Sequence, residues 1–173
     1  MKKFVSAALL SSCVALAIGC SGPAANPPAA GPSAEGARFR LTAEPASAQD
    51  VKAVRESAKD EEEVTIVGRI GGDVNPWVEG QAAFMVVDNS LKPCNEKDDD
   101  ACTTPWDYCC DTDVLPQSKA MVKIVGDDGR PLSTDARKLL GLKELQTVVV
   151  RGKAKRDDSG NLTVLADGVF VRN

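Results

Sequence analysis

The chain has 173 residues, with 25 acidic and 21 basic side chains, six cysteines and no histidine. This length suits one small domain with an extension. The lack of histidine removes the commonest general base and every imidazole metal ligand. A net charge of −4 disfavours binding to nucleic acid and to anionic head groups, because both are negatively charged.

Residues 1–19 have the composition of a bacterial export signal. Lys2 and Lys3 form a basic start, and the apolar run that follows is too short to span a bilayer comfortably. The segment ends in Leu-Ala-Ile-Gly-Cys, which resembles the lipobox of bacterial lipoproteins, although Ala17 stands where leucine is commoner. The resemblance implies that Cys20 is acylated and becomes the first residue of the mature protein. The alternatives are an ordinary signal peptide cut elsewhere, or a buried apolar helix.

A lipid on Cys20 would anchor the protein in the cell envelope, facing the periplasm or the exterior. Ser21 follows the cysteine, in place of the aspartate that often signals inner-membrane retention, and this favours the outer membrane. The tether is expected at residues 20–36, and beyond Cys20 it contains four prolines and no apolar side chain larger than alanine. Such a segment buries too little surface to fold, so we expect a tether.

Residues 37–63 are predicted to form an N-terminal extension. Alternation in residues 38–42 predicts a short strand. Apolar positions in residues 47–59 fall on one helical face, and Ser47 is a suitable N-cap. The acidic run of residues 60–63 would repel the negative end of that helix, and we interpret it as a solvated turn.

From residue 64 to the end, the apolar period changes to that of β-strands. The pattern predicts five strands, at residues 64–70, 82–88, 120–126, 147–155 and 162–172. A short helix is expected at residues 133–142, a hairpin turn at residues 156–161, and a β-bulge near Gly168. One apolar residue set should face a common interior: Ile66, Val86, Ile124, Val148, Val150 and Val164.

Three strands, a short helix and a closing hairpin resemble the order of an oligonucleotide/oligosaccharide-binding (OB) barrel, and the pattern is similar to that of small exported bacterial OB-fold proteins. The resemblance covers residues 64–172 and implies a mainly β fold. The expected architecture is a small five-stranded OB-like barrel in residues 64–173. It has an N-terminal helix, a helix between the third and fourth strands, and a cysteine-rich insertion between the second and third. Another small β-rich barrel or sandwich is the alternative.

OB folds commonly bind ligands on the second and third strands and on two loops. One of those loops carries Trp77, but a single aromatic ring with two aspartates makes a poor platform for single-stranded nucleic acid. Strand alternation points Arg69, Arg151 and Lys153 outward on neighbouring strands, with Lys155 beside them. This surface is a candidate contact for an anionic glycan, a lipid head group or an acidic protein. The alternative is a solvated face that balances nearby acids.

The insertion contains Cys94, Cys102, Cys109 and Cys110, separated by seven, six and zero residues. Structural zinc sites usually pair cysteines two to four residues apart, and redox centres usually show C-x-x-C. In an exported domain, clustered cysteines most often form disulfides, so we predict two disulfides and no metal. The pairing stays open, except that Cys109 and Cys110 should not pair with each other. Trp106 and Tyr108 are further candidate contact residues.

The function predicted from these features is a lipid-anchored extracytoplasmic OB-like module that is not an enzyme and needs no cofactor. Its partner would be an envelope protein or a glycan, reached from a membrane-anchored position. Two alternatives remain open. One is a cysteine-based redox or metal-handling envelope protein, and the other is a nucleic-acid-binding OB domain.

Overall fold

The computed structural model describes residues 31–97 and 102–172. The predicted signal peptide and Cys20 lie outside the described residues. Within them, the strands and α-helices are β1 (Gln49–Asp50), α1 (Val51–Ser57), β2 (Glu63–Ile70), β3 (Ala83–Val87), β4 (Lys119–Ile124), α2 (Ala136–Leu140), β5 (Thr147–Arg156) and β6 (Leu162–Val171). Short 3-10 turns are η1 (Gly36–Phe39), η2 (Cys94–Glu96), η3 (Pro105–Asp107), η4 (Cys109–Asp111) and η5 (Leu115–Gln117).

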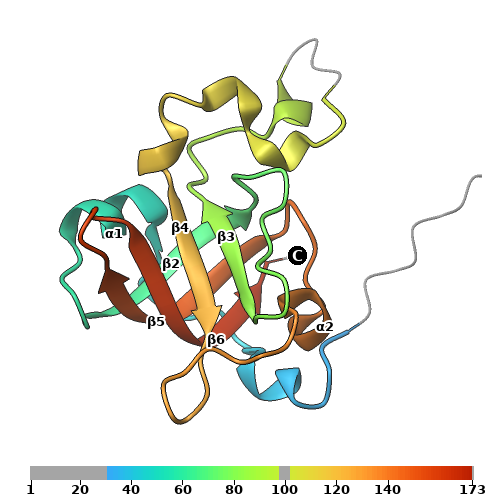
Figure 1. Ribbon diagram of the computed structural model, residues 1–173, viewed down its shortest axis with the longest axis vertical. Coiled ribbons are helices and arrows are strands. Elements are labelled where there is room, and N and C mark those ends of the chain that lie inside the picture. The colour runs from blue at the N-terminus through green and yellow to red at the C-terminus, as the bar shows by residue number, and fades with distance from the viewer. Residues whose placement is uncertain (1–30, 98–101, 173) are drawn as a thin grey trace, which may run out of the picture.

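The strands close into a barrel (Figure 1). Their order is β2-β3-β4-β6-β5, and β5 pairs back onto β2. The β4–β6 pairing is parallel, and the other pairings around the barrel are antiparallel. The short β1 adds to β2 in parallel. This topology, with α2 between β4 and β5, confirms the predicted five-stranded OB-like barrel.

The barrel interior holds the predicted core. All six residues of the predicted set are fully buried: Ile66, Val86, Ile124, Val148, Val150 and Val164. They join one large apolar cluster that also contains Phe84 and Leu139. The alternation of buried and exposed residues along β5 explains why the strand phase was readable from the sequence.

The predicted bulge is also present. Arg151 of β5 faces Gly168 of β6, whereas the next residue, Gly152, faces Ala166, so Asp167 is the extra residue. A Cβ on Gly152 would lie 2.2 Å from the carbonyl oxygen of Leu165. Only glycine allows the two strands to approach this closely.

The N-terminal extension differs from the prediction. Residues 38–42 contain the end of η1 and a single bridge from Arg40 to Val169 instead of a strand. Helix α1 begins at Val51, because Ser47 has a left-handed φ of 61° and Gln49–Asp50 pair with β2. Ser33, placed in the tether by the sequence, donates its N–H to Leu139 O at 2.9 Å. The folded unit therefore includes the last residues of the predicted tether.

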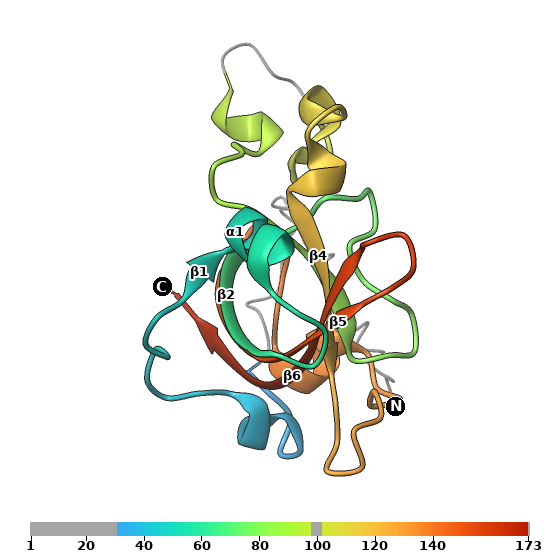
Figure 2. The same cartoon turned by 90° about the vertical axis from the view of Figure 1, so that its left-hand side faces the viewer.

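The cysteine-rich insertion leaves the barrel between β3 and β4, as expected. Figure 2 shows its turns rising from one end of the barrel, while η1 and α2 lie at the opposite end. Across the two described stretches of chain, no helix has the length and apolar character that crossing a membrane requires.

Candidate functional site

The insertion is fixed to the barrel through Tyr108 and its neighbours. Tyr108 is fully buried, and burial raises the pKa of its hydroxyl to about 12. The N–H of Gly72 donates to Trp106 O at 2.7 Å. A Cβ on Gly71 would lie 2.5 Å from the same oxygen, so the glycine pair after β2 is what lets the insertion pack here.

Four potential metal ligands converge inside the insertion, and we call them the cysteine–aspartate cluster. Each offers one ligand atom, and all these atoms lie within 4.8 Å of one another: the Sγ atoms of Cys94, Cys102 and Cys109 and a carboxylate oxygen of Asp107. Cys109 Sγ is 3.7 Å from Cys94 Sγ and 3.8 Å from Cys102 Sγ. Cys94 is fully buried and Cys109 is exposed, so the cluster lies at the surface with one side open.

Backbone geometry explains how Asp107 and Cys109 reach the same point. Tyr108, between them, has a left-handed conformation with φ 57° and ψ 35°. The Cys109 N–H donates to Asp107 Oδ1 at 2.9 Å, and Thr104 Oγ1 donates to Asp107 Oδ2 at 2.9 Å. Burial opposes ionisation of Asp107, but these hydrogen bonds outweigh it and hold its pKa below the usual range. Asp107 is therefore a fixed, ionised carboxylate beside the thiols.

The predicted disulfides are not confirmed. A disulfide has an S–S bond of about 2.0 Å, whereas the two Sγ separations at Cys109 are 3.7 and 3.8 Å. Within the described residues, no two cysteine sulfurs lie at disulfide-bonding distance. Cys110 is exposed and does not belong to the cluster, although it is adjacent to Cys109 in the sequence.

The environment of Cys109 does not favour a reactive thiolate. The pKa of the Cys109 thiol is raised well above its usual value, and the largest cause is hydrogen bonding with Cys94, followed by hydrogen bonding with Asp107. Nucleophilic and redox cysteines need the opposite shift, because the thiolate is the reactive form. The arrangement thus gives no support to a redox role for this thiol.

The three candidate aromatic residues have different surroundings. Trp77 is only 5 % exposed, and its Nε1 donates to Glu144 Oε1 at 2.6 Å. Tyr108 is also interior. Trp106 is partly exposed and donates from Nε1 to Val74 O at 3.0 Å. Trp106 is therefore the one of these three that offers its ring to a partner, next to Val74, which is 66 % exposed.

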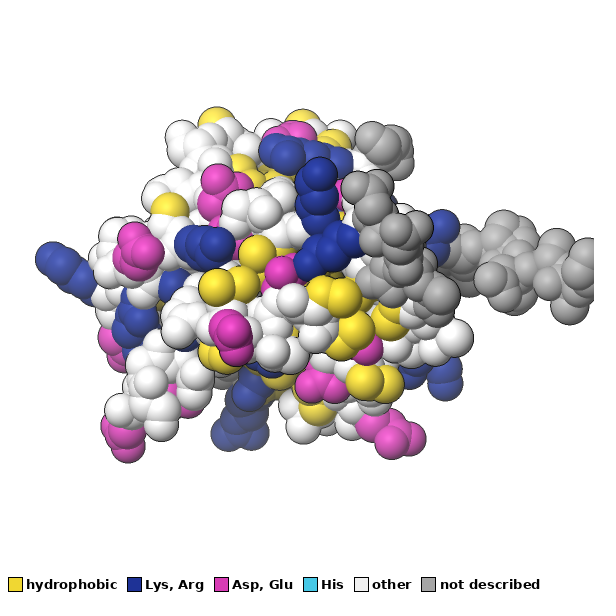
Figure 3. All heavy atoms as spheres, turned by 90° about the horizontal axis from the view of Figure 1, so that it is seen from above, with side chains coloured by type: hydrophobic (Ala, Val, Ile, Leu, Met, Phe, Trp, Pro, Cys, Tyr) yellow, Lys and Arg dark blue, Asp and Glu magenta, His cyan; other side chains and the backbone are white. Residues whose placement is uncertain are grey.

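The candidate basic residues are largely paired with acids. Arg69 contacts Glu96 at 2.8 Å, and Arg151 contacts Asp167 at 2.8 Å. Lys155 contacts both Asp60 and Glu61. The structure thus favours a charge-balanced face over a basic patch. On the face that carries the insertion, Figure 3 likewise shows positive and negative side chains interspersed.

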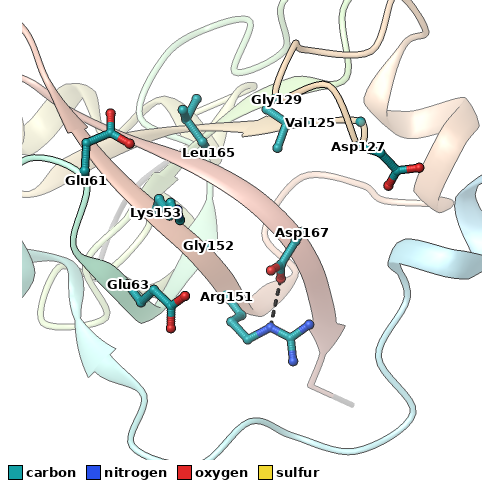
Figure 4. Close-up of a pocket in the computed structure, with 11 residues that line it drawn as sticks. Glu61, Glu63, Val125, Asp127, Gly129, Arg151, Gly152, Lys153, Leu165 and Asp167 are labelled. Atoms are coloured by element: carbon teal, nitrogen blue, oxygen red, sulfur yellow. Dashed lines mark hydrogen bonds and ion pairs between the residues drawn. The ribbon is translucent and has the colours of Figure 1, made fainter.

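Arg151 and Lys153 line a groove of about 660 Å³ on the outer surface of β5 and β6 (Figure 4). Its acidic residues come from the turn before β2, the start of β2, the turn after β4, and β6: Glu61, Glu63, Asp127 and Asp167. Arg151 Nε donates to Asp167 Oδ1 at 2.8 Å across it. Lys153 makes no ion pair with any described residue. Carboxylates therefore outnumber cations in the groove.

No protein-family model matches this chain, and no curated protein matches it either. The site has to be interpreted from its own chemistry. Sequence reasoning missed Asp107, whose signal was its position two residues before Cys109. It also missed the acidic lining of the groove, since Asp127 looked like an ordinary turn residue and Asp167 like part of the bulge.

Proposed function

We propose that the protein is a lipid-anchored, extracytoplasmic OB-like binding module that is not an enzyme and that holds a positively charged segment of another envelope protein. The observation that carries this proposal is the groove on β5 and β6, with four carboxylates and two cations among its lining residues. Anchoring is supported by the lipobox-like sequence that ends at Cys20.

The charge of the groove favours a basic protein segment. Among the lining residues carboxylates outnumber cations, but Lys155 contacts Glu61 and Arg38 lies 3.8 Å from the fully exposed Asp127. Glu63 and Asp127 are therefore the carboxylates of the groove that attract lysine and arginine side chains and orient them on approach. The groove walls belong to strands of a closed barrel and to two short turns. A wall of this kind is largely preformed, which reduces the entropy lost on binding.

A glycan fits the groove less well. A sugar ring is commonly held by packing its C–H face against an aromatic side chain, and the described residues that line the groove include no aromatic side chain. A nucleic acid would face the same shortage of rings together with the repulsion of four carboxylates.

Site-specific photocrosslinking in intact envelopes tests the proposal. The full chain would carry a photoreactive residue at Asp127, which lines the groove, or at Asp113, an exposed acid outside it. We expect one discrete protein adduct from position 127 and none from position 113. Glu63→Lys should reduce adduct yield about 1.4- to 5-fold, because an exposed ion pair with the partner contributes about 0.2 to 1 kcal/mol.

Two results would contradict this function. Equal adducts from positions 113 and 127 would show that the groove is not the contact surface. Loss of the adduct on adding soluble envelope glycan, with no effect of Glu63→Lys, would replace the protein partner by a glycan.

A further inference from the structure

We propose that the cysteine–aspartate cluster binds one zinc ion that holds the insertion in its folded form. This role is independent of the groove and of its partner. The cluster contains the ligand types that zinc accepts, with three thiols and one carboxylate, and it needs no histidine.

The distances fit a tetrahedral site. A Zn–S bond is about 2.3 Å, so two sulfurs on one tetrahedral zinc are about 3.8 Å apart. The Cys94–Cys109 and Cys102–Cys109 Sγ separations are 3.7 and 3.8 Å. Cys94 Sγ lies 3.8 Å from Asp107 Oδ1, close to the length of another tetrahedral edge.

The fourth ligand distinguishes zinc from other ions. Copper(I) prefers soft thiolate and thioether ligands, and a carboxylate adds little to such a site. Calcium takes six to eight oxygen ligands, which three sulfurs cannot replace. An iron–sulfur cluster distributes its cysteines over several iron atoms, whereas these ligand atoms all lie within 4.8 Å of one another.

Asp107 also has the supporting contact that zinc ligands usually have. Thr104 Oγ1 donates to one carboxylate oxygen and the Cys109 N–H to the other, so the carboxylate is oriented before any ion arrives. Outer hydrogen bonds of this kind fix ligand geometry and strengthen binding. Thr104 and Asp107 belong to the same short turn of the insertion, so they support the site locally.

Zinc binding at these four ligands releases protons and requires no oxidant. The Asp107 carboxylate enters ionised, and the thiols of Cys94, Cys102 and Cys109 lose three protons to solvent as they bind the dication. The ion offsets the repulsion among four negative ligands. Since Tyr108 lies between two of those ligands, the bound metal would also fix the residue that packs the insertion onto the barrel.

The test starts from the full chain extracted from envelopes anaerobically and without chelators. We expect about one zinc per chain by elemental mass spectrometry. Cys102→Ser, at a partly exposed ligand, should lower the zinc content to background, whereas Cys110→Ser, outside the cluster, should retain it. Cobalt exchanged into the parent protein should show sulfur-to-cobalt absorption that disappears in Cys102→Ser and persists in Cys110→Ser.

A milder pair of variants tests the geometry without removing a ligand. Thr104→Ala should weaken zinc affinity about 10- to 100-fold in competition with a chelating dye. Its exposed neighbour Thr103 serves as the control, and Thr103→Ala should leave the affinity unchanged. Metal-free protein with two disulfides would overturn the proposal, as would one stoichiometric copper in place of zinc or equal zinc in Cys102→Ser and the parent.

Discussion

Single residues of the barrel interior make the strand assignment testable. Ile66 is fully buried in the main apolar cluster, so Ile66→Ala leaves a cavity that the closed barrel cannot easily fill. We expect a loss of about 2 to 5 kcal/mol in the free energy of unfolding. Val74→Ala is the control, because Val74 is 66 % exposed. Urea denaturation would measure both, and equal midpoints would show that the core assignment is wrong.

At the scale of the element, α1 depends on a residue outside itself. Asp50 precedes the helix but makes no side-chain cap. The cap comes from Asp88 after β3, whose Oδ2 accepts from Lys52 N at 2.8 Å while Oδ1 accepts from Ser90 N at 2.9 Å. Asp88→Ala should therefore destabilise the protein by about 1 to 2 kcal/mol, whereas Asp50→Ala should change little.

The same contact predicts a pH dependence. Burial raises the pKa of Asp88, but the hydrogen bonds from Lys52 and Ser90 outweigh it and leave the pKa below its usual value. This stabilisation is complete above the unfolded-state pKa of about 3.9 and is lost as pH falls through the lower folded-state pKa. Thermal melts from pH 6 to pH 2 should show a smaller acid-induced loss for Asp88→Ala than for the parent. An equal acid-induced loss of thermal stability in the two proteins would show that Asp88 does not have this role.

Elements differ in how far their sequence determines them. Strands β2 to β6 were predictable because branched or other apolar residues recur along each of them, with clear alternation in β4 and in the second half of β5. Helix α1 begins later than expected because Ser47 adopts a left-handed conformation and the next residues pair with β2. The cysteine–aspartate cluster was not predictable from cysteine spacing. It depends on the backbone at Tyr108, which turns Asp107 and Cys109 toward a common point.

At the scale of the whole molecule, the proposed anchor can be separated from the fold. Cys20 precedes the described residues, so Cys20→Ala should leave the barrel intact and move the protein from the membrane fraction to the soluble fraction. The control is Cys13→Ala, within the predicted signal, which should remain in the membrane. Fractionation followed by a denaturation curve checks both points. A Cys20→Ala protein that stays in the membrane would contradict lipid anchoring.

The pairing of β5 with β2 bears on how neighbouring copies behave. Tethers on one membrane would raise the local concentration of the domain, which is the condition under which open sheet edges add strands to one another. Among the strands of residues 31–97 and 102–172, β2 to β6 each have partners on both sides, and the remaining edge belongs to β1, which is only two residues long. If the proposed anchor crowds these domains on a membrane, closure of the barrel would protect them from aggregating edge to edge, and a partner would have to bind the side-chain surfaces.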